Sequence, residues 1–111
     1  MNIYDTANKL ASEIKQSEEY VEYKKVKEEL NNMPEIKEKI KSFEFARQEM
    51  QKLIIKGGTP LEEKATEIQN LYAELIQNEV AKKYFDLEIR FSVMITDINK
   101  IISEVVKDVI M

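Results

Sequence analysis

The sequence contains no cysteine, no histidine and no tryptophan. Without cysteine, disulfides, thiolate metal sites and cysteine nucleophiles are excluded, and without histidine the commonest general base is missing as well. Most familiar catalytic constellations therefore lack a required member. The composition predicts a protein that is not an enzyme, with no catalytic residues, no cofactor site and no metal site.

Glycine and proline are scarce too, with only 2 of each in 111 residues. This shortage argues against flexible linkers and against the many tight turns of an all-β sandwich. Hydrophobic residues make up 43% of the chain, enough for a core, and charged residues make up 34%. Because domains typically hold about 50–250 residues, we predict a single helical domain over residues 1–111.

Basic residues are outnumbered, 17 against 21 acidic residues, which gives a net charge of −4. A mildly acidic chain argues against general nucleic-acid binding, because that function normally needs a basic surface. No apolar run reaches the roughly 18 residues of a membrane span. The N-terminal residues also lack the layout of a signal peptide. We therefore expect a cytoplasmic protein with no membrane span.

Capping residues and helix breakers mark the expected helix starts in the first half of the chain. Asn2 and Ser17 are good N-caps because their side-chain oxygens accept hydrogen bonds from free backbone N–H groups. Pro34 fits the first position of a third helix, where its missing N–H costs nothing. Three helices are expected before residue 57.

The remaining breakers divide the second half of the chain. Gly57 and Gly58 fit the C-terminal end of the third helix, where glycine adopts the left-handed conformation. Thr59-Pro60-Leu61-Glu62 has the pattern of a capping box for a fourth helix, and Asn78 is the expected cap of a fifth. The predicted helices span residues 3–15, 18–31, 34–56, 60–77 and 79–110.

The last predicted helix carries a heptad seam, in which apolar residues alternate at spacings of four and three. At 1.5 Å per residue this helix would be roughly 48 Å long. A compact domain of this size has a radius of gyration of only about 13 Å, so we expect the helix to protrude from the core. The seam consists of Val80, Tyr84, Leu87, Phe91, Met94, Ile98, Ile101 and Val105.

Further apolar residues lie beside this seam and widen it into a broad band. Large exposed apolar patches are rare on monomers, so we predict that the band is a self-association surface. The alternative is a helix sandwiched between two others of the same chain. We predict an all-α, antiparallel bundle of about five helices that forms a homodimer or a higher oligomer. The predicted interface residues are Phe85, Ile89, Val93, Ile95, Ile102, Val106 and Ile110.

Two other functions compete with this prediction. Acidic clusters can hold Mg²⁺ or Ca²⁺, but both clusters in this sequence open a helix, where acids are favoured by the helix dipole alone. They comprise Glu18, Glu19 and Glu22, and Glu62, Glu63 and Glu67. The lysine groups are interleaved with glutamates, which is typical of a solvated helix face. The alternative function is that of an RNA-binding accessory protein. For the leading prediction, a self-associating protein that binds other proteins, we expect no direct contact with nucleic acid.

The order of these features resembles the YlbF/YmcA/YheA family of small helical bacterial proteins. Ser17-Glu18-Glu19-Tyr20 is similar to the family's S-E-E-Y opening, and Phe43 followed by Arg47-Gln48 is similar to its F-x-x-x-Q stretch. Pro34 falls at a family helix start, and residues 57–60 match a variable hairpin turn. The entry into the last helix resembles the family's N-x-x-V-x-x-Y-x-x-x-E-x-x-F pattern through Asn78, Val80, Tyr84, Glu88 and Phe91.

The resemblance implies an all-helical, oligomer-forming cytoplasmic protein that regulates through protein partners rather than by catalysis. In Gram-positive bacteria, studied relatives form a complex that directs messenger-RNA processing by a membrane-anchored endoribonuclease. They affect competence, sporulation and biofilm formation. Some relatives carry cysteines that help to hold iron–sulfur clusters. This chain has none, so the resemblance places it in the cysteine-free, YheA-like branch and implies no cluster.

Overall fold

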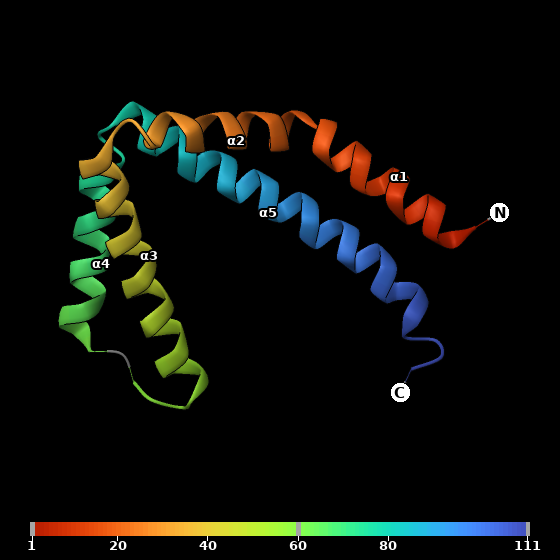
Figure 1. Cartoon of the computed structure of the whole chain (residues 1–111). Helices are drawn as coiled ribbons and strands as arrows, with labels where there is room; N and C mark the ends of the chain where they lie inside the picture. Colours follow the sequence, from red (N-terminus) through yellow and green to blue (C-terminus); the bar gives the residue numbers. More distant parts are fainter. Residues whose placement is uncertain (1, 60, 111) are drawn as a thin grey trace. The chain divides into compact units, whose positions relative to one another are not determined.

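The computed structural model describes residues 2–59 and 61–110, which form five helices and no strand (Figure 1). The predicted all-α fold class is therefore confirmed. The helices are α1 (Ile3–Gln16), α2 (Glu18–Leu30), α3 (Pro34–Ile55), α4 (Glu62–Leu75) and α5 (Glu79–Val106).

The chain divides into two compact units. The first unit combines the residues up to Lys25 with those from Tyr84 onward, and the second spans Val26–Lys83. The first unit thus contains α1, most of α2 and most of α5. The second contains α3 and α4 with the helix ends that flank them. The single domain expected over residues 1–111 stays a prediction.

Three helix starts are fixed by the caps that the sequence indicates. Asn2 Oδ1 accepts a hydrogen bond of 2.8 Å from the backbone N–H of Tyr4 at the start of α1. Ser17 Oγ accepts one of 3.2 Å from the N–H of Tyr20 in α2. Asn78 Oδ1 accepts two, each of 3.0 Å, from the first turn of α5. Each side chain satisfies donors that have no partner inside the helix, so these predictions are confirmed.

The C-terminal end of α3 is a Schellman motif, as the two glycines predict. Gly57 has a φ of +83°, and its N–H donates to the carbonyl of Ile54 over 3.0 Å. The N–H of Gly58 donates to the carbonyl of Leu53 over 2.9 Å. A Cβ built on Gly58 would lie 2.6 Å from Leu53 Cδ1, so the turn packs directly against that side chain.

The predicted capping box before α4 is wrong. The helix begins at Glu62 with Leu61 at its N-cap, and no side chain caps it. Leu61 has an extended backbone, and its side chain lines an apolar groove. Thr59 therefore does not cap α4. Pro60, which the prediction placed at the first helical position, lies outside the described residues.

The last helix is shorter than expected, because it ends at Val106 rather than at residue 110. The N–H groups of Val109 and Ile110 both donate to the Val106 carbonyl over 3.1 Å, which closes a turn instead of a further helical turn. Residues 101–110 are all exposed.

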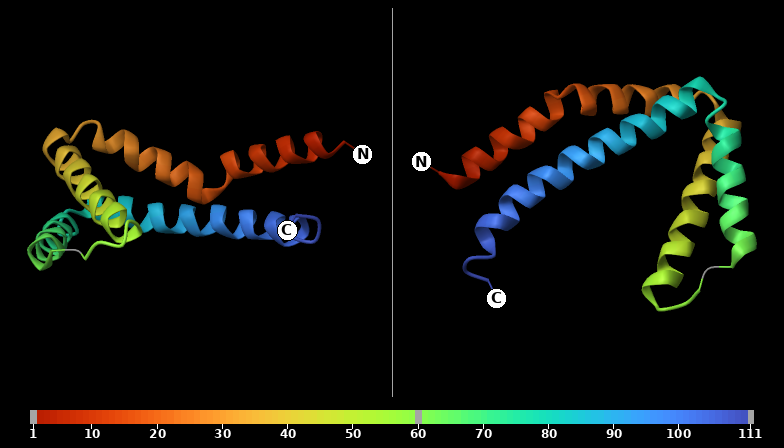
Figure 2. Two further views of the ribbon diagram at one scale, coloured as in Figure 1. Left: turned by 90° about the horizontal axis from the view of Figure 1, so that it is seen from below. Right: turned by 180° about the vertical axis from the view of Figure 1, so that it is seen from behind.

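In the second unit, α3 and α4 run side by side in opposite directions (Figure 2). The rings of Phe43 and Tyr72 lie 5.5 Å apart between their centroids. Lys39 Nζ and Glu74 Oε1 form an ion pair of 2.7 Å at the surface of the same hairpin. The buried apolar residues of this unit are Val26, Leu30, Ile40, Phe43, Leu75 and Ala81.

In the first unit, α2 packs on the first half of α5 through aromatic side chains. The ring of Tyr23 lies 5.6 Å from that of Tyr84 and 5.7 Å from that of Phe91, measured between centroids. Tyr20 also contacts Phe91, at 6.2 Å. Aromatic pairs at these separations stabilise a contact beyond their buried area. The buried residues of this unit, Tyr84, Phe85 and Leu87, all belong to the start of α5.

Candidate functional site

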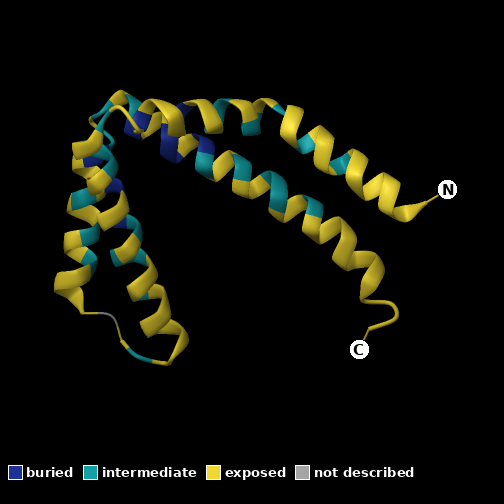
Figure 3. Cartoon of the chain, viewed as in Figure 1, coloured by how far each residue is buried: buried dark blue, intermediate teal, exposed yellow. Residues whose placement is uncertain are grey.

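The apolar seam of α5 changes from buried to exposed along its length. Tyr84 and Leu87 are buried, and Met94 in the middle of the seam is half-buried. Ile101 and Val105 are 69% and 72% exposed. Figure 3 shows this change in colour along the helix, from dark blue through teal to yellow. The same side-chain chemistry at the same spacing is therefore covered in the first half of α5 and uncovered in the second.

The N-terminal helix of the same unit also presents uncovered apolar residues. No residue of α1 is buried. Ile3 and Tyr4 are exposed, whereas Leu10 and Ile14, further along the same apolar row, are half-buried. The helix is strongly amphipathic, and a helix of this kind normally buries its apolar face against a partner. Within the described chain, that face has no complete cover.

The structure places the seven predicted interface residues in different settings. Phe85 is buried by its own chain, so it has almost no surface left for a second molecule. Ile95 is half-buried. The other five are exposed apolar side chains, and all but the last belong to α5: Ile89, Val93, Ile102, Val106 and Ile110.

The list of predicted interface residues leaves out Ile101 and Val105, which belong to the seam and are exposed. A heptad period identifies a face of a helix but not the element that covers it. The lengths of the two paired helices indicate how much of the seam is covered. Helix α2 has 13 residues and α5 has 28, so α2 covers less than half of α5. Ser17, the cap between α1 and α2, marks where that cover ends.

An open groove of about 470 Å³ lies along α5 in the first unit, beside Glu19 of α2. Val93 and Met94 form its middle, with Arg90 on one side and Asp97 on the other. Arg90 and Asp97 are both exposed. Neither is ion-paired within the described part of the chain. The groove thus combines an apolar centre with one basic and one acidic group along the same helix.

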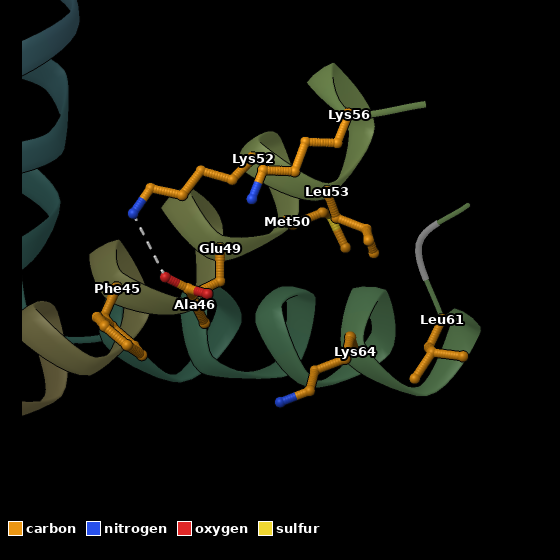
Figure 4. Close-up of a pocket in the computed structure, with 9 residues that line it drawn as sticks. All are labelled: Phe45, Ala46, Glu49, Met50, Lys52, Leu53, Lys56, Leu61 and Lys64. Carbon is orange, nitrogen blue, oxygen red and sulfur yellow. Dashed lines mark ion pairs between the residues drawn. The ribbon is translucent and has the colours of Figure 1, made fainter. Parts of the chain in front are cut away.

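A second groove, of about 490 Å³, lies in the α3–α4 hairpin and is drawn in Figure 4. Apolar side chains contributed by both helix ends line it, and Leu53 contacts the Gly57-Gly58 turn. Lys52 at its edge pairs with Glu49 over 3.6 Å. The lining comprises Phe45, Ala46, Glu49, Met50, Lys52, Leu53, Lys56, Leu61 and Lys64.

The electrostatics of the described residues offer little chemistry. The clearest change is at Lys39, whose pKa is raised because Glu74 accepts a hydrogen bond from its ammonium and attracts its charge. Across residues 2–59 and 61–110, the carboxylates form no group of three or more arranged to hold a metal ion. Within the same ranges, every helix is too short or too polar to cross a membrane.

Comparison with known proteins identifies the family. The family model described as "Control of competence regulator ComK, YlbF/YmcA" matches residues 3–107. The chain belongs to this family. The match covers all five helices, so the resemblance seen in the sequence is confirmed. The description of the family implies a regulatory role.

Bacterial relatives match the chain over nearly its whole length. A UPF0342 protein of Desulfitobacterium hafniense is 34% identical over 110 residues, which cover 99% of this chain and 89% of the relative. A UPF0342 protein of Halothermothrix orenii is 33% identical over 102 residues, covering 92% and 86%. One of Streptococcus uberis is 31% identical over 108 residues, covering 97% and 96%. Similar proteins of about this length therefore occur in several bacteria.

Proposed function

We propose that the chain is a non-enzymatic regulatory protein that self-associates and acts by binding other proteins. The observation that carries the self-association is the change in burial along the α5 seam. Tyr84 and Leu87 are buried, whereas Ile101 and Val105, in the same row, are exposed. Burying a large aliphatic side chain contributes about 1.5–3 kcal/mol. A second molecule that covers this row would bury several such side chains, and each would stabilise the complex.

The proposed partner in this assembly is another copy of the chain. In the first unit, α1 and the second half of α5 both carry apolar residues that lack cover. Amphipathic helices with uncovered apolar faces associate with each other readily, as in helical bundles. A dimer or a higher oligomer would bury these faces while the charged sides of the helices stay in water.

The regulatory part of the proposal rests on the family. The description of the family refers to control of a competence regulator, which is a function exerted on other proteins or on gene expression. We propose a role of this class in the bacterial cytoplasm, in the control of messenger-RNA processing or development as the family resemblance implies. The lack of histidine and cysteine supports a role without catalysis.

Light scattering on purified protein tests the self-association directly. We expect the mass of a dimer or a higher oligomer at micromolar concentration. The double variant Ile101→Ser with Val105→Ser removes apolar area that the chain itself does not cover. It should shift the mass toward the monomer and leave the helical circular dichroism nearly unchanged.

A matched control uses another exposed apolar pair. Ile54 and Ile55 lie at the end of α3, outside the first unit, and both are exposed. The double variant Ile54→Ser with Ile55→Ser should keep the mass of the parent protein. A parent protein that is monomeric at micromolar concentration would overturn the proposed self-association.

A further inference from the structure

We propose that two copies of the chain pair through antiparallel α5 helices, related by a two-fold axis that passes between Val93 and Met94. This inference rests on the proposed self-association and specifies its geometry. The second copy is the occupant of the groove on α5, in which Val93 and Met94 are flanked by Arg90 and Asp97.

The positions of the groove residues follow from helix geometry. Arg90 and Asp97 are seven residues apart, which is close to two helical turns, so both lie on the same side of α5. Val93 and Met94 lie midway between them. If a second α5 runs in the opposite direction about this midpoint, Arg90 of each copy lies opposite Asp97 of the other. The contact would hold two ion pairs on either side of an apolar centre.

The direction of pairing follows from charge. In a parallel pair in register, Arg90 would lie opposite Arg90 and Asp97 opposite Asp97. Like charges placed opposite each other are destabilising, and opposite charges fix orientation and register. The antiparallel pair turns both repulsions into attractions. An isologous contact of this kind closes after two copies, as a two-fold axis requires.

The flanking positions of the same helix repeat this pattern. Lys83 lies seven residues before Arg90, and Glu104 lies seven residues after Asp97. At these four positions, spaced by seven residues, the charges are therefore basic, basic, acidic, acidic. Reversal of the helix direction about the Val93–Met94 midpoint places Lys83 opposite Glu104, as it places Arg90 opposite Asp97. A seven-residue spacing corresponds to 3.5 residues per turn, which two packed helices can follow over this length.

The apolar area at the centre is available to a partner. Val93 is 53% exposed, and Met94 is half-buried with its remaining surface in the groove. Further along the seam, Ile101 is also exposed. Methionine is flexible and adapts to irregular apolar surfaces, which suits a contact between Met94 of one copy and Val93 of the other across the axis.

Charge reversal with complementation tests this geometry. Arg90→Glu places a second carboxylate opposite Asp97 at both pairs, and Asp97→Arg places a second guanidinium opposite Arg90. Each variant alone should dimerise roughly tenfold or more weakly than the parent, by sedimentation equilibrium, because both attractions become repulsions. An equimolar mixture of the two variants should recover dimers, and native mass spectrometry should show that these are heterodimers.

The single chain that carries both changes, Arg90→Glu with Asp97→Arg, should recover homodimers. Pairing within one helix cannot explain this recovery, because the two positions are about 10 Å apart along the axis. The matched control is Lys100→Glu, the same reversal of a basic charge at an exposed position of α5 that does not line the groove. It should dimerise like the parent. In a mixture with Asp97→Arg it should form fewer heterodimers than Arg90→Glu does, because only one of the two contacts is then attractive.

The outcomes separate this inference from the proposed function. A monomeric parent protein overturns both. A parent oligomer that both single reversals leave intact overturns the antiparallel α5 contact and leaves self-association standing. Weakened single variants whose mixture stays monomeric overturn the register. Recovery in the mixture and in the double variant supports the two-fold axis between Val93 and Met94.

Discussion

The α3–α4 hairpin of the second unit and the first unit, which holds α1 and most of α5, are built from similar amphipathic helices but complete their packing differently. In the hairpin, Ile40, Phe43 and Leu75 are buried within a contact between neighbours in the sequence. In the other unit, burial is confined to the start of α5, and apolar residues at the far end, such as Ile101, stay exposed. The difference shows that amphipathicity indicates a need for cover, whereas chain connectivity decides whether the chain supplies it.

Removal of a buried hairpin side chain should have the largest effect on stability. Leu75 is 1% exposed, and Leu75→Ala leaves a cavity in the core of the second unit. We expect a loss of about 2–5 kcal/mol in the free energy of unfolding, measured by chemical denaturation. The exposed counterpart, Ile101→Ala, should change the unfolding of dilute protein by far less. Equal losses for the two variants would remove the contrast between the two regions.

The turn that closes the hairpin should show a smaller effect. Gly57 has a φ of +83°, which residues with a Cβ atom rarely adopt. Gly57→Ala should cost about 1–2 kcal/mol in the free energy of unfolding, because the left-handed conformation brings its Cβ close to the backbone. Gly57→Asn is the control, since asparagine tolerates this conformation better and should cost less. An alanine variant as stable as the parent would show that the turn does not need its glycine.

The surface ion pair of the hairpin should have the smallest effect. Glu74 raises the pKa of Lys39, so the pair stabilises the folded chain while the lysine is charged. This contribution is fully present below the unfolded pKa of Lys39 and is lost as the pH rises through its higher folded pKa. Lys39→Ala should therefore lower the melting temperature slightly near neutral pH, less so in high salt, and not at all at strongly alkaline pH. A difference that grows toward alkaline pH would contradict the assignment.

The sequence predicts those parts of the fold that depend on local chemistry. Asn2, Ser17 and Asn78 cap helices, and Gly57 ends one, because each acts on backbone groups within a few residues. The predicted start of α4 is wrong, because the helix begins at Glu62 without a side-chain cap, although the local pattern places one at Thr59.

The candidate interface depends on tertiary packing and is predicted only in part. The apolar band indicates a helix with too much hydrophobic surface, and Ile89 and Val93 are indeed exposed. Phe85, in the same band, is covered by its own chain, and Ile101 in the inner seam is not. Periodicity assigns residues to faces, but the length and position of the covering helix determine which part of a face reaches solvent. That information lies in the pairing of α2 with α5, which are far apart in the sequence.

The aromatic packing between α2 and α5 gives the protein an intrinsic optical signal. Because the chain has no tryptophan, its near-ultraviolet absorption and emission come chiefly from five tyrosines. Three of these, Tyr20, Tyr23 and Tyr84, lie in one cluster with Phe91. Tyrosine emission will therefore report largely on this cluster. A tryptophan introduced at Phe91 would be the sole indole in the molecule, and would allow energy transfer from its tyrosine neighbours to be followed without an external dye.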